Sequence, residues 1–153
     1  MSFRTTSAAF EGAVARRVDV QVQIAGGTPA FNVVGLADKA VAESRERVRA
    51  AFAAIGLSLP GKRLIVNLAP ADRPKEGSHF DLPIALGLLA ALGVLPQDVL
   101  GEHLAMGELG LDGSIAPAPS ALPAAMLASE LELGFIGPEA SGPEAAWAGG
   151  ELP

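Results

Sequence analysis

The sequence of 153 residues contains no cysteine and no tyrosine, and it has one tryptophan and six phenylalanines. The absence of cysteine excludes disulfides, thiolate metal sites and cysteine nucleophiles. Because aromatic residues make up only 5% of the chain, the core must be built from Val, Leu, Ile and Ala. Half of the residues are hydrophobic and 18% are charged, which is typical of a folded chain. A chain of this length is expected to form one domain.

Long hydrophobic runs are also missing. The longest apolar stretch covers residues 82–95, which is 14 positions, whereas a helix needs about 20 to cross a bilayer. The first ten residues mix polar and apolar side chains, so they do not have the pattern of a secretory signal. We therefore expect a cytoplasmic domain that makes no contact with a membrane.

Positive charge is absent from the second half of the chain. All 11 Lys and Arg residues lie at or before Lys75, together with six acids, so residues 1–75 carry a net charge of +5. Residues 76–153 carry 11 acids and no Lys or Arg, a net charge of −11. A basic segment can form a surface for nucleic acid or an acidic partner. The alternative is a salt-bridged fold with an acidic surface, and the sequence favours it because halves of a sequence need not be halves of a molecule.

Strands are predicted over the first third of the chain. Residues Val18–Ile24 alternate apolar and polar side chains, which is the pattern of a half-buried strand. A Gly-Gly pair at 26–27 separates this strand from a second one at Phe31–Val34, and predicts a hairpin between the two. An earlier strand is expected over Thr6–Ala15.

A helix is predicted to follow these strands. Asp38 is a good N-cap for it, and Gly56 is a suitable residue to end it. Glu43 and Arg47 are spaced to form a favourable i,i+4 pair on its solvent side. The apolar face repeats at helical spacing over Val41, Val48, Phe52 and Ile55.

The second half predicts an alternation of helices and hairpins. We expect a buried strand over 64–68, a polar loop over 69–79, an apolar helix over 80–95, a hairpin turning at Asp112-Gly113, a helix over 122–131 and a strand over 133–136. Hairpins that precede helices are typical of an α+β fold. After Gly137 the composition turns to Gly, Pro, Ala and Glu. We therefore expect a domain over residues 1–136 and a boundary segment over 137–153.

The sequence contains neither a complete phosphate-binding loop nor histidines at metal-ligand spacing. Residues Gly56–Lys62 match G-x-x-x-x-G-K, but Arg63 stands where a phosphate-binding loop needs Ser or Thr to hold Mg²⁺. This segment also follows a helix and enters a strand, the reverse of the required order. His79 and His103 are isolated from each other and lack metal-ligand spacing. We expect neither an ATPase site nor a metal site in this chain.

The polar loop leaves an enzymatic interpretation open. Ser78 could act as a nucleophile with His79 as its base, and Asp81 could orient the imidazole. Residues that are adjacent in sequence rarely face each other as such a triad requires, and no oxyanion hole can be argued. A degenerate hydrolase therefore stays an alternative.

Basic residues gather around the strand predicted at 64–68. No aromatic residue is interleaved with them, so base stacking is not supported. Any nucleic-acid contact would be to phosphates, and would be sensitive to salt and insensitive to sequence. The candidate residues are Lys62, Arg63, Arg73 and Lys75, with Arg45 and Arg47 on the preceding helix.

Four segments carry a resemblance to a known family: residues 31–36, 43–50, 66–87 and 107–113. The chain up to about Ile136 resembles the N-terminal domain of the Mg-chelatase-like AAA+ ATPases of the ComM/YifB type. This resemblance implies a two-layer, Lon-protease-like fold of the ribosomal-protein domain-2-like kind, with a mixed sheet and helices packed on one face. It also implies a degenerate site, since the catalytic Ser of Lon falls on His79 and the catalytic Lys falls near Leu122.

The same resemblance implies the context of the domain. Family members carry an AAA+ module, which would bind ATP and Mg²⁺, and the ComM type is a hexameric helicase that promotes branch migration during natural transformation. The motifs of that module are missing from this sequence. We expect a non-catalytic, homo-oligomeric module that aids ring assembly and contacts DNA or a partner. The alternatives are a degenerate hydrolase using Ser78 and His79, or a pure oligomerisation scaffold.

Overall fold

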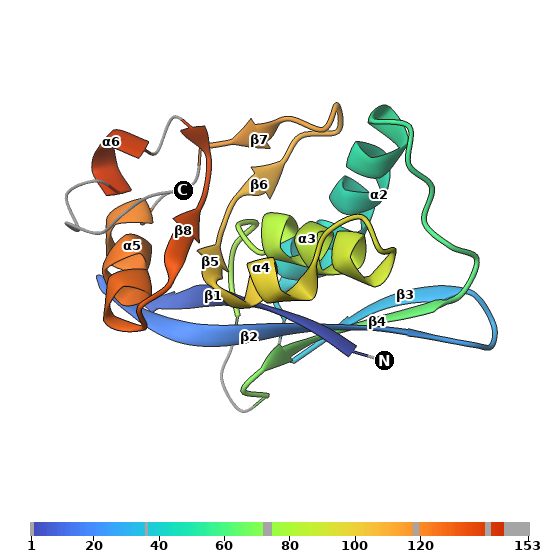
Figure 1. Cartoon of the computed structure of the whole chain (residues 1–153), viewed down its shortest axis with the longest axis horizontal. Helices are drawn as coiled ribbons and strands as arrows, with labels where there is room; N and C mark the ends of the chain where they lie inside the picture. Colours follow the sequence, from blue (N-terminus) through green and yellow to red (C-terminus); the bar gives the residue numbers. More distant parts are fainter. Residues whose placement is uncertain (1, 36, 72–74, 118–119, 140–141, 146–153) are drawn as a thin grey trace.

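The computed structural model describes residues 2–35, 37–71, 75–117, 120–139 and 142–145, and shows an α+β fold around a mixed sheet (Figure 1). The sheet has six strands in the order β3-β4-β2-β1-β5-β8. Their bounds are β1 Ser2–Glu11, β2 Val14–Ala25, β3 Ala30–Val34, β4 Arg63–Ala69, β5 His103–Ala105 and β8 Gly134–Ile136. A separate hairpin joins β6 Glu108–Leu109 to β7 Ile115–Ala116. The helices are α1 Lys39–Ala42, α2 Ser44–Ala54, α3 Asp81–Ala91, α4 Gln97–Gly101, α5 Ala121–Glu130 and α6 Gly142–Ala145.

The larger core lies between α2, α3 and one face of the sheet. Residues paired directly across strands share a face, so Thr5 of β1 lies on the same side as Val20 of β2 and Leu68 of β4. This side packs against α3, where Gly87 lies so close to Val22 that an added Cβ would stand 2.6 Å from a Val22 methyl carbon. The aliphatic core expected from the composition is therefore formed here.

A second core lies on the opposite face of the sheet. Ala8 points away from α3, because successive strand residues alternate sides, and it packs with Leu104, Phe135 and the alanines of α5. Figure 1 shows β5 and β8 rising between α3 and α5. The expectation that all helices cover one face is wrong, while the mixed sheet and the α+β class are confirmed. The more specific Lon-like fold stays a prediction.

The hairpin predicted between β2 and β3 is also wrong. Strand β4 lies between them, antiparallel to β2 and parallel to β3. The Gly-Gly pair therefore joins two strands that are not neighbours in the sheet, because β4 occupies the position between them. At the end of β3, Gly35 has φ +114°, and a Cβ there would stand 2.2 Å from the Leu68 carbonyl oxygen. Glycine is required at this close approach of two backbones.

The helix expected after Asp38 is split at Glu43 into α1 and α2. Asp38 caps α1 as predicted, since its Oδ1 accepts a hydrogen bond of 2.8 Å from the Val41 amide. Gly56 follows α2 with φ +82°, as expected for a residue that ends a helix. Ile55 departs from the predicted apolar face, because it lies past the last turn and is 59% exposed.

The predicted domain limits of 1–136 and 137–153 stay a prediction. Helix α6 begins after residue 136 and packs against α5, and residues 146–153 lie outside the described residues. Within the described part of the chain, no helix has both the length and the apolar character needed to cross a membrane.

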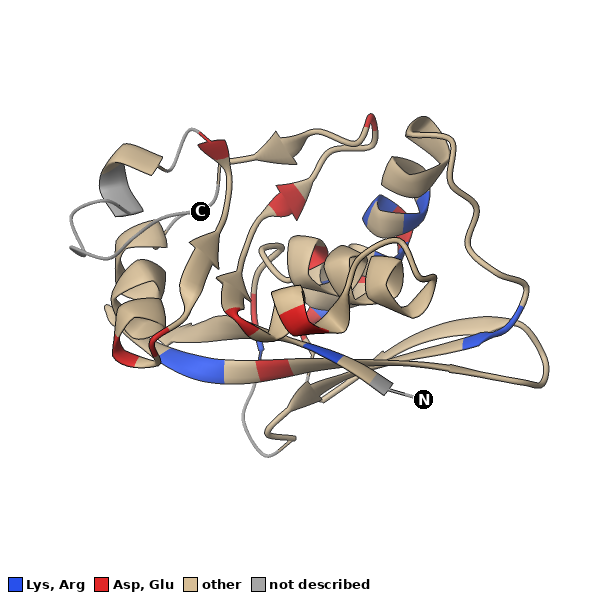
Figure 2. Cartoon of the chain, in the orientation of Figure 1, with Lys and Arg blue, Asp and Glu red and all other residues tan. Residues whose placement is uncertain are grey.

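The separation of positive and negative charge along the sequence is partly retained in the three-dimensional structure. Figure 2 shows most Lys and Arg residues on the long strands, on α2 and on the segment that leads into β4. Asp and Glu are found on α4, α5 and the β6–β7 hairpin, and also on β2, where Asp19 lies beside Arg17. We call the elements that carry these cations, which are β1, β2, β4, α2 and the segment that leads into β4, the basic side of the domain.

Candidate functional site

The loop that was a candidate for hydrolysis does not assemble a triad. His79 is 8% exposed, and its Nε2 lies 2.6 Å from the Ala8 carbonyl oxygen rather than from Ser78. A carbonyl oxygen only accepts, so Nε2 carries the proton and donates it to Ala8. The imidazole is packed between two aromatic rings, with centroid distances of 5.2 Å to Phe10 and 4.2 Å to Phe80.

The electrostatics of His79 agree with a packing role. Burial lowers the pKa of His79 below its ordinary value, and the bond to Ala8 and the charges of Asp81 and Asp38 oppose this shift without cancelling it. The ring is therefore neutral near pH 7. Because Nε2 is committed to a backbone carbonyl, its proton is part of the packing rather than of a catalytic relay.

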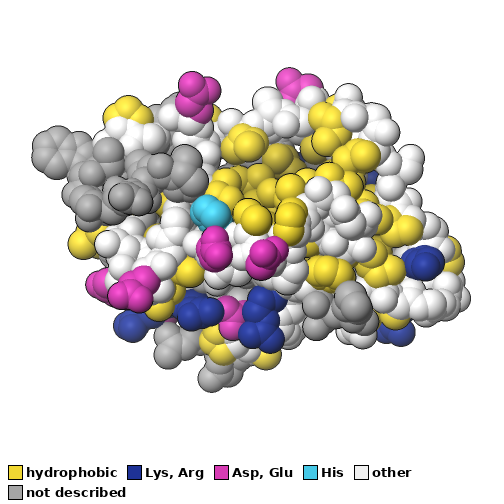
Figure 3. All heavy atoms as spheres, viewed as in Figure 1, with side chains coloured by type: hydrophobic (Ala, Val, Ile, Leu, Met, Phe, Trp, Pro, Cys, Tyr) yellow, Lys and Arg dark blue, Asp and Glu magenta, His cyan; other side chains and the backbone are white. Residues whose placement is uncertain are grey.

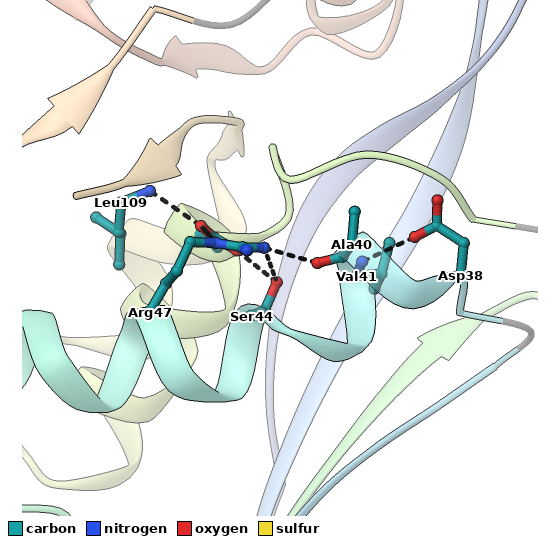
Figure 4. Close-up of polar contacts among 7 residues, drawn as sticks. Asp38, Ala40, Val41, Ser44, Arg47 and Leu109 are labelled. Carbon is teal, nitrogen blue, oxygen red and sulfur yellow. Dashed lines mark hydrogen bonds and ion pairs between the residues drawn. The ribbon is translucent and has the colours of Figure 1, made fainter. Parts of the chain in front are cut away.

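Asp81 is instead the centre of a buried polar network (Figure 4). Its carboxylate is fully buried and accepts hydrogen bonds from three residues on two elements: the Ser44 hydroxyl and the Arg47 guanidinium on α2, and the Leu109 amide on β6. Arg47 binds in a forked geometry, with Nε 2.6 Å from Oδ2 and Nη2 3.1 Å from Oδ1. The bond to Asp81 raises the pKa of Arg47. The network joins α2, the start of α3 and the β6–β7 hairpin.

This network corrects two sequence expectations. Arg47 pairs with Asp81 rather than with Glu43, and its Nη2 also donates to the Ala40 carbonyl oxygen at 2.6 Å. Asp81 is used by α2 and β6 and does not orient His79. A buried acid at the start of an apolar helix signals that a partner is needed. The identity of this partner could not be predicted from the sequence, because Arg47 is 34 residues away along the chain.

The predicted nucleic-acid residues separate into three groups. Lys75 is fully buried, and its ammonium donates to the Pro70 carbonyl oxygen, so it presents no charge at the surface. Arg47 is held by Asp81. Arg73 lies outside the described residues. Arg45, Lys62 and Arg63 remain at the surface or close to it.

These three residues gather along β3, which forms one edge of the sheet. Arg45 donates to the Ala42 carbonyl oxygen at 3.0 Å and to the Phe31 carbonyl oxygen of β3 at 3.4 Å. Together with Arg63 it lines a shallow pocket of about 370 Å³ beside β3. We call this strip the basic edge, and it consists of Arg45, Arg63, Arg49 and Lys62.

A second pocket extends the basic edge toward the other end of β3. It has a volume of about 240 Å³, and Arg49 and Lys62 are its two cations. The Arg49 guanidinium lies 5.8 Å from the centroid of the Phe31 ring, within the range of a cation–π contact. Arg49 was not among the sequence candidates, although its place on the same helix as Arg45 is a signal that could have included it.

The degenerate Lon-like site at His79 and Leu122 stays a prediction. Leu122 is in the first turn of α5, and α5 packs on the second core, which Phe10 also borders. His79 reaches that core through its hydrogen bond to the Ala8 carbonyl oxygen and through its contact with Phe10. Among the described residues, no group of three His, Asp or Glu side chains is arranged to hold a metal ion.

Comparison with known proteins gives the family. A family model described as subunit ChlI of Mg-chelatase matches residues 20–141. The chain belongs to this family.

Named relatives refine the assignment. The protein YifB of Escherichia coli K12 is 44% identical over 114 residues, which are 74% of this chain and 22% of the relative. The competence protein ComM of Haemophilus influenzae is 42% identical over 124 residues, 81% of this chain and 24% of the relative. The uncharacterized protein Rv2897c of Mycobacterium tuberculosis is 41% identical over 125 residues, 82% of this chain and 25% of that protein. The predicted Mg-chelatase-like ComM/YifB family is therefore confirmed, and the chain spans about a quarter of the length of these relatives.

Proposed function

We propose that this chain is the non-catalytic N-terminal module of a ComM-type AAA+ ATPase that acts on DNA, in branch migration during natural transformation. The observation that carries the proposal is the 42% identity to a protein named competence protein ComM. ATP and Mg²⁺ would bind in an AAA+ module outside this sequence, and the parent would form a hexameric ring in the cytoplasm. In this arrangement the module aids ring assembly and contacts DNA.

The basic edge supports the DNA contact. It places four cations beside a sheet edge in a chain whose net charge is −6. Guanidinium and ammonium groups bind phosphate oxygens, and such contacts give salt-dependent binding without sequence preference. The acidic elements that follow α3 would repel phosphate, so DNA would approach from the basic side.

Fluorescence anisotropy of the chain with labelled single-stranded and branched DNA tests this contact. We expect binding that weakens linearly on a logarithmic salt axis. The variants Lys62→Glu and Arg49→Glu each change one side of the same pocket, and each should weaken binding more than Arg16→Glu, an exposed arginine that faces neither basic-edge pocket. Absence of binding at low salt would contradict the proposal and favour an assembly or docking scaffold.

The absence of catalysis has its own test. A model-peptide assay of the wild-type chain should show no hydrolysis, because the His79 ring faces Ala8 and Asp81 is bound by Arg47. Hydrolysis that disappears in both Ser78→Ala and His79→Ala would establish the degenerate hydrolase instead.

Light scattering combined with DNA binding distinguishes the proposed module from a pure oligomerisation scaffold. Self-association that persists while Lys62→Glu and Arg63→Glu leave DNA binding of the full-length protein unchanged would favour a scaffold. We expect the charge reversals to weaken DNA binding without altering assembly.

A further inference from the structure

One face of the sheet is only partly covered by helices. Helix α5 covers the end of this face at β1, β5 and β8, through Ala8, Leu104 and Phe135. The rest of the same face, over β2, β4 and β3, is left open by the described helices. In Figure 1, α2, α3 and α4 lie above β2, β3 and β4, and no labelled helix is drawn below these three strands. The part of this face over β2, β4 and β3, with Arg4 of β1 beside it, is therefore available to a ligand.

The cross-strand register identifies the side chains on this open face. One row runs from Arg4 through Gln21 and Asn67 to Val34. The next row holds Gln23, Ile65 and Asn32, and the one after it holds Arg63 between two alanines. Neighbouring strands are about 4.8 Å apart and rows are about 6.6 Å apart, so these groups form a continuous polar patch.

The chemistry of this patch is unusual for a chain with a net charge of −6. It carries three arginines and four carboxamides, and Arg17 is the arginine at its border with α5, since it pairs with Ala8. Asp19 is the one acid of the patch within the described residues. Asp19 is already engaged by the Nε of Arg17 at 3.1 Å. We call this patch the amide–arginine face; it consists of Arg4, Arg17, Arg63, Gln21, Gln23, Asn32 and Asn67.

The carboxamides are partly ordered in advance of any ligand. The Asn67 Nδ2 donates to the Gln21 Oε1 at 3.0 Å across β4 and β2. A carboxamide both donates and accepts, so the Gln21 amide nitrogen and the Asn67 carbonyl oxygen can still bond to a ligand. This pair presents a fixed donor and acceptor beside Arg4.

We propose that the amide–arginine face binds single-stranded nucleic acid, with the arginines on the phosphates and the carboxamides on base edges. Base edges are exposed to a flat surface only when the bases are unpaired, and Asn and Gln are suited to bind them. The face carries no aromatic side chain, so stacking would be limited to guanidinium planes. Arg63 belongs to both this face and the basic edge, so a bound nucleic-acid strand would continue from one to the other. The inference rests on the proposed function.

Two adjacent arginines of β2 provide a matched test. Arg17 is on the amide–arginine face and Arg16 points to the opposite side, and their side chains are 50% and 53% exposed. Each is also near one acid, so Arg17→Glu and Arg16→Glu make the same change of charge in the same strand. With labelled oligothymidylate, Arg17→Glu should weaken binding and lower the slope of log K against log salt by about 1. Arg16→Glu should leave the slope unchanged.

Asn67→Ala tests the role of the carboxamides, because it removes the ordered amide without changing charge. It should weaken binding to single strands while the salt slope stays the same, and its thermal melt should show that the domain remains folded. Equal effects of Arg17→Glu and Arg16→Glu would overturn the inference and leave the proposed function standing. Equal affinity for duplex and single strand, with no loss in Asn67→Ala, would also overturn it. Failure of the wild-type chain to bind any DNA would instead contradict the proposed function itself.

Discussion

Two arginine–aspartate pairs in this domain have the same chemistry and opposite surroundings. Arg47 and Asp81 meet at 2.6 Å, with side chains that are 20% and 0% exposed. Arg17 and Asp19 meet at 3.1 Å, with side chains that are 50% and 29% exposed. Figure 3 shows charged side chains of both signs along the lower rim of the molecule. Asp81 has no water that could replace a lost partner, whereas both members of the exposed pair do. Burial therefore assigns the first pair to the fold and leaves the second available to a ligand.

The largest effect is expected from breaking the buried pair. Asp81→Ala removes the acceptor of Ser44, Arg47 and the Leu109 amide at once. It should lower the free energy of unfolding by about 3–5 kcal/mol, because the largely buried Arg47 side chain loses its counter-charge while the Ser44 hydroxyl and the Leu109 amide lose their acceptor. Urea denaturation followed by circular dichroism measures this loss. A loss below about 1 kcal/mol, the range of exposed pairs, would contradict the assignment of this pair to the fold.

Replacing the whole pair sharpens the comparison. The double variant Arg47→Met with Asp81→Leu removes both charges, so no unpaired ion remains in the interior. It should be more stable than Asp81→Ala by a measurable margin in the same urea experiment, since the cost of a broken buried pair is mostly the charge left behind. A double variant as unstable as the single one would show that Ser44 and Leu109, rather than Arg47, carry the network.

A smaller effect is expected at His79, the buried imidazole beside the network. Its pKa in the folded state is lowered by burial, so the unfolded chain binds the proton more readily. Stability is therefore complete above the ordinary pKa of 6.5 and falls as the pH drops below it. Urea midpoints measured from pH 7.5 to pH 5.5 should decline, and His79→Leu should flatten that decline. The control His103→Leu should retain it; the same flattening in both variants would show that His79 is not the cause.

The smallest effect is expected from the exposed pair. Arg17→Ala and Asp19→Ala should each change the free energy of unfolding by less than about 1 kcal/mol, because both groups are hydrated when unpaired. The same urea measurement as for Asp81→Ala gives a direct contrast. A cost comparable to that of Asp81→Ala would remove the distinction between the two regions.

Local patterns in the sequence predicted the elements well and their partners poorly. The alternation over Val18–Ile24 and the Asp112-Gly113 turn lie in a strand and a hairpin as expected. The pairing of β3 with β4 was missed because its register depends on a strand about 30 residues later, which no local pattern reports. The second core was missed for a similar reason: the small alanines of α5 fit either face of a sheet equally well.

The candidate site was predicted in part. Lys62 and Arg63 were candidates because they flank the strand predicted at 64–68, and Arg45 because it lies on the preceding helix. All three lie at the surface or close to it. Lys75 and Arg47 could not be told from surface cations, because burial arises from contacts with distant segments. The amide–arginine face was invisible, since its residues come from four strands and share only a cross-strand register.

The central claim is that DNA is held by the basic side of this domain and not by its acidic side. Nuclear magnetic resonance of the isotope-labelled chain, titrated with oligothymidylate, tests it most directly by locating the amide signals that move. The account predicts shifts in β2, β3 and β4, and unshifted signals in α5 and the β6–β7 hairpin. Shifts confined to α5 and that hairpin, with β2, β3 and β4 unchanged, would contradict it.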